Sequence, residues 1–159
     1  MRIALDVMGG DHAPHEIVHG AVEASLKLKD VACIYLVGNE AVIRDELAKY
    51  PRADLNRLKI VHAPDSIGMD ESPATAVRKK KQCSINICME LVKAKEADAM
   101  VSAGNSGAVA AAAVFCLGRT AGVIRPAIAT VLPTRQPNRP LLLLDAGANA
   151  DCHETWLAQ

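Results

Sequence analysis

The stretch RIALDVMGGDHAP, residues 2–14, decides the fold that this sequence predicts. Its apolar part, Arg2–Val7, is typical of a short buried strand. The pair Gly9–Gly10 ends the strand, and Pro14 occupies a position that the first turn of a helix tolerates. Apolar residues then recur on one broad helical face as far as about Lys29. A strand, a glycine loop and a helix in this order indicate the first unit of an α/β fold.

The same alternation of strand and helix continues along the chain. Ser72–Pro73 begins a helical region that reaches about Lys95, with a break near Gln82. Strands that alternate with helices favour a mostly parallel sheet with helices on both faces, in a Rossmann-like three-layer α/β/α arrangement. The further predicted strands are Val31–Val37, Leu58–His62, Ala99–Ala103, Ala127–Leu132 and Leu141–Asp145.

The composition is that of one domain with a real core. Of the 159 residues, 50% are hydrophobic but only 3% are aromatic, which suits thin helices packed closely on a sheet. The 18 basic and 18 acidic residues cancel, so no global field attracts nucleic acid or anionic lipid. The stretch His153–Gln159 resembles a helix that stops after about two turns. We therefore expect residues 1–159 to be the N-terminal part of a single, truncated α/β domain whose C-terminal part is absent.

The cysteine pattern points to a reducing compartment. The 5 cysteines include no C-x-x-C pair, and Cys33 and Cys116 lie in apolar segments where a free thiol behaves as a small hydrophobe. We find no secretory signal pattern, and the longest apolar run, Ala108–Gly118, is too short to span a bilayer. A cytoplasmic location is therefore expected.

Three loops that follow predicted strands are rich in Gly, Asp, Asn and Ser: residues 6–12, 102–108 and 145–149. In parallel α/β sheets, ligands bind at the carboxyl ends of the strands, where loops lead into helix N-termini. Backbone N–H groups of glycine loops and the positive helix end together predict an anion site. The alternative is that these loops are tight turns with good helix caps. The predicted substrate-binding or phosphate-binding residues are Asp6, Gly9, Gly10, Asp11, Ser102, Gly104, Gly107, Asp145 and Asn149.

The motifs that these loops lack narrow the choice of anion. The sequence contains no G-x-x-x-x-G-K-[ST] phosphate loop for ATP. It also contains no G-x-G-x-x-G dinucleotide fingerprint after the first strand. The anion is therefore expected to be small, or to belong to something other than a mononucleotide.

The run Arg78–Lys81 is the one strong cluster of charge in the sequence. A solvated helix face explains most runs of this kind. Four successive residues cover more than one helix face, however, so at least one cation is expected to point toward the sheet or a partner. The run predicts either a phosphate clamp or a docking patch for an acidic protein, with Arg78, Lys80 and Lys81 as the candidates.

Two histidine-containing stretches invite a catalytic interpretation. The segment His15–His19 matches H-E-x-x-H, the zinc-protease signature, but it lies in the first turns of a surface helix without a third ligand. We therefore predict no metal there. His12 lies beside Asp11 in the first glycine loop, where it can act as a general acid, orient a phosphate or cap the following helix. Cys152 has no histidine base that the sequence positions, and we interpret it as structural.

Read together in order, these stretches resemble the bacterial PlsX family of acyl-carrier-protein:phosphate acyltransferases. The resemblance begins with Arg2–Asp6 and Met8–Pro14 and covers the whole chain. It departs from the family's pattern at Ser106, where Thr is usual, and at Gln82 and Cys83, where Asp and Ser are usual. The other matching stretches are Val61–Ala63, Pro73, Arg78–Lys81, Ser84, Glu90–Lys93, Val101–Asn105, Gly118–Arg119, Arg125–Pro126, Leu144–Asp145 and Gly147–Asn149.

The resemblance implies an isopropylmalate dehydrogenase-like fold and a reaction in phospholipid synthesis. Inorganic phosphate would attack the thioester of a long-chain acyl carrier protein, giving acyl-phosphate and free carrier without ATP or a cofactor. The implied partners are acyl carrier protein, inorganic phosphate and a second copy of the chain, with no nucleic acid. The implied location is cytoplasmic, with peripheral contact to the inner face of the membrane through the C-terminal part of family members.

The resemblance also suggests roles for individual residues. His12, Asn105 and Ser106 are the catalytic candidates: His12 as the proton donor, and Asn105 and Ser106, with Asn149, as hydrogen-bond donors to phosphate or the oxyanion. Arg78, Lys80 and Lys81 would balance charge or dock the acidic carrier. The alternatives are a phosphate acetyl- or butyryltransferase that uses coenzyme A esters, a non-catalytic anion-binding domain, and a zinc hydrolase.

Overall fold

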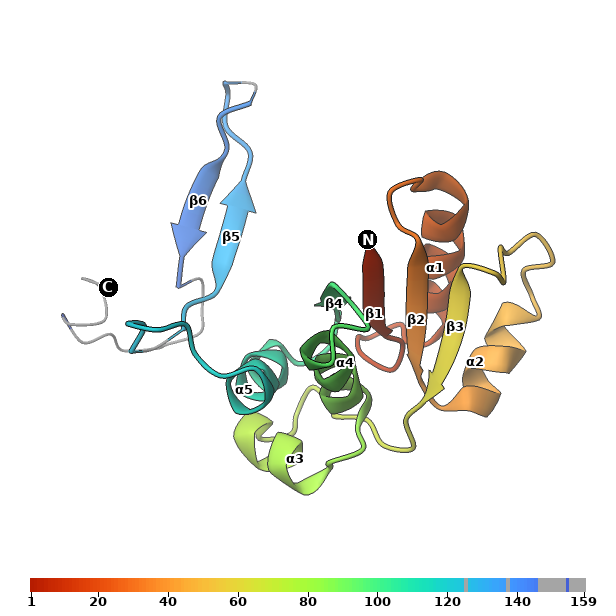
Figure 1. Ribbon diagram of the computed structural model, residues 1–159, viewed down its shortest axis with the longest axis horizontal. Helices are drawn as coiled ribbons and strands as arrows, with labels where there is room; N and C mark the ends of the chain where they lie inside the picture. The colour runs from red at the N-terminus through yellow and green to blue at the C-terminus, as the bar shows by residue number, and fades with distance from the viewer. Residues whose placement is uncertain (125, 137, 146–153, 155–159) are drawn as a thin grey trace. The chain divides into compact units, whose positions relative to one another are not determined.

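The computed structural model describes residues 1–124, 126–136, 138–145 and 154 (Figure 1). The chain divides into two compact units, Met1–Leu117 and Gly118–Gln159, each of which is described by itself. Within the described residues, the first unit contains strands β1–β4 and helices α1–α5, and the second contains strands β5 and β6. The single domain predicted for residues 1–159 stays a prediction.

The strands of the first unit form a parallel sheet, as predicted. The strand order is β3-β2-β1-β4, and β1 pairs on both sides, with Leu5 opposite both Leu36 and Val101. Because the strands run in one direction, all their carboxyl ends meet at one edge of the sheet. The bounds are β1 Arg2–Asp6, β2 Cys33–Gly38, β3 Leu58–His62 and β4 Ala99–Val101.

Helices cover both faces of this sheet, which confirms the predicted three-layer arrangement (Figure 1). Helices α1 and α2 pack on one face and α4 packs on the other, while α3 and α5 pack together and α5 packs against α4. The helix bounds are α1 His15–Lys27, α2 Glu40–Leu47, α3 Pro73–Lys79, α4 Ser84–Lys93 and α5 Ser106–Cys116.

Strand β2 and the middle of β1 are apolar because both of their faces are covered by other elements. On β2, Ile34 and Leu36 join the core under α1 and α2, while Val37 joins the core under α4. On β1, Ala4 belongs to the core under α4. Since side chains alternate along a strand, Asp6 points to the same face as Ala4, and it is buried there. The sheet therefore ends in a buried carboxylate.

The helical region after Ser72 is broken where the sequence predicted a break. The chain leaves the helical conformation at Lys80, the C-cap of α3, and α4 begins at Ser84. The Asn86 side-chain amide donates to the carbonyl oxygens of Val77 and Lys80, at 2.9 and 3.0 Å, and so satisfies the end of α3. The basic run 78–81 therefore straddles a helix end instead of covering one helix.

The second unit contains an antiparallel strand pair. Strand β5, Ala129–Leu132, pairs with β6, Leu141–Leu144. The sequence predicted both strands, but as further members of a mostly parallel sheet. The segment between them is too short for the crossover that parallel neighbours need, so the two strands pair as a hairpin. None of the helices described here is long and apolar enough to cross a membrane.

Candidate functional site

The buried Asp6 carboxylate joins two of the three predicted glycine loops. Its Oδ1 accepts a hydrogen bond from Met8 N at 3.2 Å, and its Oδ2 accepts one from Ser102 Oγ at 2.7 Å. Ser102 Oγ in turn accepts from Gly104 N at 3.1 Å. The loops after β1 and β4 are thus tied by a chain of hydrogen bonds that begins at one carboxylate.

The backbones of these two loops are in direct contact at glycine. A Cβ atom on Gly9 would overlap Asp6 Oδ2 and lie 2.9 Å from Ser102 Oγ and 3.0 Å from Gly104 N. A Cβ atom on Gly104 would lie 3.0 Å from Gly9 Cα. Gly10 has φ of 114°, a left-handed conformation that favours glycine. Of the residues predicted in the first two loops, Asp6, Gly9, Ser102 and Gly104 are therefore brought together in space.

Asn105 begins α5 and also holds a neighbouring segment of chain. Its Oδ1 accepts from Ala108 N at 3.0 Å, which caps the helix. Its Nδ2 lies 3.3, 3.4 and 3.2 Å from the carbonyl oxygens of Gly68, Met69 and Glu71. Only 7% of Asn105 is exposed. Both ends of its amide are therefore used within the fold.

The exposed groups at the start of α5 are those of Ser106 and Gly107. The N–H groups of a first helical turn have no partner inside the helix, so they are available to an anion. A Cβ atom on Gly107 would lie 2.8 Å from Pro73 Cγ. Glycine at this position therefore also allows α3 to begin close beside α5.

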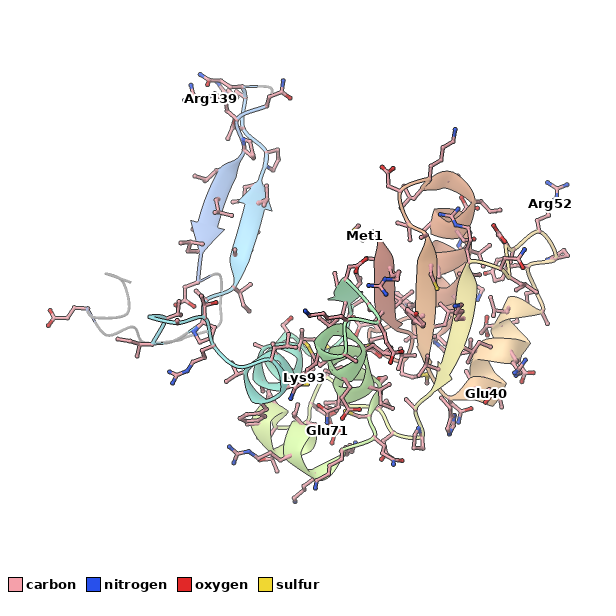
Figure 2. The ribbon with its side chains drawn as sticks, in the orientation of Figure 1. Met1, Glu40, Arg52, Glu71, Lys93 and Arg139 are labelled. Atoms are coloured by element: carbon pink, nitrogen blue, oxygen red, sulfur yellow. The ribbon has the colours of Figure 1, made fainter. Side chains whose placement is uncertain are left out.

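Lys80 is engaged in a brace that holds the segment 66–71. Its Nζ lies 2.6 Å from Glu71 Oε1 and 2.8 Å from the carbonyl oxygen of Ser66. Glu71 Oε1 also accepts from Gly68 N at 2.7 Å (Glu71 is labelled in Figure 2). The Gly68 N–H, followed by the Lys80 ammonium, lowers the pKa of Glu71 below its ordinary value of 4.5. Sequence reasoning missed this role for Glu71.

Acidification is expected to weaken this brace. Because folding lowers the pKa of Glu71, its contribution to stability is present above the ordinary value of 4.5 and is lost as the pH falls through the lowered pKa. Urea unfolding of the wild type and of Glu71→Gln, at neutral pH and at acid pH, measures this contribution to the free energy of unfolding. The stability difference between them should shrink in acid, while other carboxylates cancel in the comparison. A difference that stays constant with pH would contradict the role given to Glu71.

The remaining predicted residues are less closely tied to these loops. The residues Asp11 and His12 are exposed, and the His12 carbonyl oxygen accepts from Glu16 N at 3.2 Å at the start of α1. In the second unit, Asp145 follows β6 with φ of 58°. Asn149 and Cys152 lie outside the described residues.

The two histidines of the H-E-x-x-H match have other partners. His15 Nδ1 lies 3.1 Å from Glu46 Oε2, while the His19 ring stacks on Tyr50 with centroids 5.6 Å apart. Within the part of the chain that the structure describes, no group of three His, Cys, Asp or Glu side chains could hold a metal ion. The motif joins α1 to α2 and the segment after it.

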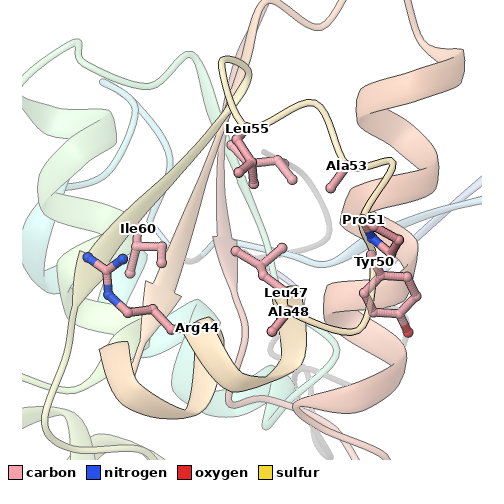
Figure 3. Close-up of a pocket in the computed structure, with 9 residues that line it drawn as sticks. Arg44, Leu47, Ala48, Tyr50, Pro51, Ala53, Leu55 and Ile60 are labelled. Atoms are coloured by element: carbon pink, nitrogen blue, oxygen red, sulfur yellow. The ribbon is translucent and has the colours of Figure 1, made fainter.

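A cavity of about 570 Å³ lies apart from the predicted site residues (Figure 3). It is bounded by α2, by β3 and by the segment between them, and none of the residues predicted for the site lines it. Arg44, its one charged side chain, pairs with Glu40 at 2.6 Å, so its charge is compensated. The hydrogen bonds that join the two strand-end loops involve none of the residues that line this cavity.

Comparisons with known proteins match the whole chain. The sequence matches a family model described as "Fatty acid synthesis protein" over residues 1–159. It is 52% identical over 159 residues to a phosphate acyltransferase of Nostoc sp. (strain PCC 7120), covering 100% of this chain and 46% of that protein. It is 52% identical over 159 residues to one of Trichormus variabilis, covering 100% of this chain and 45% of that protein. It is 51% identical over 158 residues to one of Synechocystis sp., covering 99% of this chain and 44% of that protein. The chain spans less than half the length of these relatives.

Proposed function

The chain belongs to the fatty acid synthesis protein family, and from this membership we propose that the protein transfers an acyl group to inorganic phosphate. The proposed donor is the thioester of a long-chain acyl carrier protein, and the proposed setting is bacterial phospholipid synthesis. A phosphate oxygen attacks the acyl carbon, the C–S bond breaks, and the departing thiolate takes up a proton. The products are acyl-phosphate and free carrier, and because both acyl compounds are activated, ATP is not needed.

The observation that carries this proposal is the name that the curated relatives share, "Phosphate acyltransferase". These relatives are 51–52% identical to this chain over 99–100% of its length. The geometry of the strand-end loops supports it, because two glycine loops meet at the sheet edge and the next helix, α5, begins directly after the second loop. An enzyme of this kind must desolvate and orient phosphate and stabilise an oxyanion.

Phosphate is proposed to bind at the first turn of α5. The N–H groups of Ser106 and Gly107 and the Ser106 hydroxyl are donors, and the helix dipole favours an anion there. Gly9, Gly10 and Gly104 allow the substrate to approach the backbone closely. The exposed His12 is the proposed proton donor to the departing thiolate.

Asp6, Ser102 and Asn105 are proposed to position this site. A carboxylate beside phosphate repels it, and both oxygens of Asp6 already accept hydrogen bonds within the protein. Asn105, a catalytic candidate on sequence grounds, acts in this proposal by holding the start of α5 and the segment 66–71 in place.

Further contributions are proposed from the family resemblance. Asp11 belongs to the first glycine loop, and Asp145 and Asn149 belong to the third, whose part in phosphate binding stays a prediction. Arg78 and Lys81 balance charge or dock the carrier. Lys80, which pairs with Glu71, contributes by bracing the segment 66–71. The protein is proposed to be a cytoplasmic homodimer with peripheral membrane contact.

Phosphate-dependent release of free carrier from palmitoyl-acyl carrier protein tests the proposal. The assay uses this chain alone, and this chain together with the C-terminal part of a full-length relative. Palmitoyl-coenzyme A is assayed in parallel as the comparison donor. Ser106→Ala should lower turnover roughly a hundredfold, as loss of an oxyanion donor does, whereas Ser106→Thr should keep it. Transfer from palmitoyl-coenzyme A but not from palmitoyl-acyl carrier protein would favour the phosphate acetyl- or butyryltransferase alternative. No release in either form of the assay would overturn the proposal.

A further inference from the structure

The end of α3 divides the basic run into one inward and three outward cations. Lys80 is held by Glu71 and Ser66. Arg78, Lys79 and Lys81 are exposed, and no carboxylate of the described residues lies within ion-pair distance of them. Figure 2 shows side chains with nitrogen at their tips extending outward around α3.

The helix segments around these cations add no acidic side chain. Helix α5 carries no charged residue, and α3 and the first turn of α4 carry no acidic one. Among the described residues, two carboxylates lie near the run, and one of them, Glu71, is already paired with Lys80. The other, the exposed Asp65, forms a β-bridge with Cys83, two residues after Lys81, so that the three cations outnumber the one unpaired carboxylate beside them. On a chain with a formal net charge of zero, this is a local positive surface.

An exposed aromatic ring lies within this positive surface. The guanidinium carbon of Arg78 lies 4.7 Å from the centroid of the Phe115 ring, and 47% of Phe115 is exposed. The cation–π contact orients the guanidinium while leaving its N–H groups free for carboxylate. Aromatic and Arg side chains together are typical of the residues that dominate binding at protein interfaces. We name Arg78, Lys79, Lys81 and Phe115 the α3 patch.

The α3 patch lies on the same two helices as the proposed phosphate site. Pro73 and Gly107, near the starts of α3 and α5, are in contact. Arg78 and Phe115 meet again near the ends of the same helices. At 1.5 Å of rise per residue, the patch lies roughly 10 Å along the helices from the start of α5. A partner on the patch would thus be near the phosphate site.

We propose that the α3 patch docks a protein that presents carboxylates around an apolar side chain, and that this partner is the acidic acyl carrier. This inference rests on the proposed function. A membrane is the weaker occupant, because three cations near an anionic surface contribute only about 1 kcal/mol each. The apolar faces of α3 and α5 are also packed against each other, which leaves no amphipathic face to insert.

Carrier binding by charge-reversed variants tests the inference. The patch variant is Arg78→Glu, Lys79→Glu, Lys81→Glu, and the matched control reverses three other exposed cations, as Lys29→Glu, Arg52→Glu, Lys93→Glu. The patch variant should bind acyl carrier protein at least about tenfold more weakly, and the control should bind like the wild type. Wild-type binding should weaken steeply between about 0.05 and 0.5 M salt. Phe115→Ala should weaken binding without changing this salt dependence.

Kinetic measurements distinguish an error in the docking inference from an error in the proposed function. In the acyl-transfer assay, the patch variant should show a raised KM for the acyl carrier substrate with little change in kcat. An active wild type and a patch variant with an unchanged KM would overturn the docking inference while leaving the proposed function standing. An inactive wild type that binds the carrier only through the patch would leave docking standing and remove the function. Loss of binding to phosphatidylglycerol vesicles, with carrier binding intact, would overturn docking in favour of a membrane.

Discussion

Gly9→Ala is expected to separate the two glycine loops and to abolish most of the activity. The added methyl group meets Asp6 Oδ2, Ser102 Oγ and the backbone nitrogen of Gly104, so a backbone segment must move. Overpacking of this kind costs about 1–3 kcal/mol of stability. A displacement of about 1 Å at a catalytic site lowers turnover roughly a hundredfold. Urea unfolding and the phosphate-dependent assay measure the two effects.

Gly20→Ala is the matched control for this change. Gly20 lies within α1, and nothing lies within 4 Å of a Cβ atom placed on it. Alanine in a helix interior is more favourable than glycine by about 1 kcal/mol, so this variant should be slightly more stable and equally active. If Gly9→Ala were as stable and as active as Gly20→Ala, the contact between the two loops could not be important.

Asn105→Ala is expected to lower both stability and turnover. It removes the N-cap of α5, which costs about 0.5–2 kcal/mol. It also removes the donor that faces the carbonyl oxygens of Gly68, Met69 and Glu71, so the segment 66–71 loses its attachment to α5. Hydrogen exchange of that segment should quicken. Turnover should fall roughly a hundredfold, as it does when a site is displaced by about 1 Å.

Asn105→Ser separates the two functions of this side chain. Serine keeps an oxygen that caps α5 but has no amide to hold the segment 66–71. Asn105→Ser should therefore lose less unfolding stability than Asn105→Ala, because only the amide contacts are removed, while exchange in the segment quickens and turnover falls. Unchanged exchange with lost turnover would instead favour direct contact between Asn105 and the reacting oxyanion. Near-normal turnover in both variants would remove Asn105 from the site.

The alternation of strands and helices in the first unit could be predicted because it depends on local patterns. Apolar runs bounded by glycine loops mark the strands, and a helical break near Gln82 was visible in the sequence. The pairing of β5 with β6 was not predicted, although the short segment between them contained the reason. The α5 start was predicted as an anion site, and Ser106 and Gly107 are exposed there.

The roles of single polar side chains depended on tertiary contacts. Asp6 and Ser102 are 96 residues apart in sequence and share a hydrogen bond. Asn105 reaches a segment 34–37 residues earlier in the chain. Glu71 was not singled out at all, because its partner Lys80 was assigned to carrier docking or charge balance instead.

The sequence by itself determined which residues form strands, helices and glycine loops, because backbone conformation follows from neighbouring residues. Tertiary structure alone decided which polar groups are hydrogen-bonded within the protein and which remain available to a ligand. A buried donor or acceptor without a partner is costly, so Asp6 and Asn105 take partners from distant segments. Arg78 and Lys81, beside Lys80 in the chain, are left exposed because α3 ends between them.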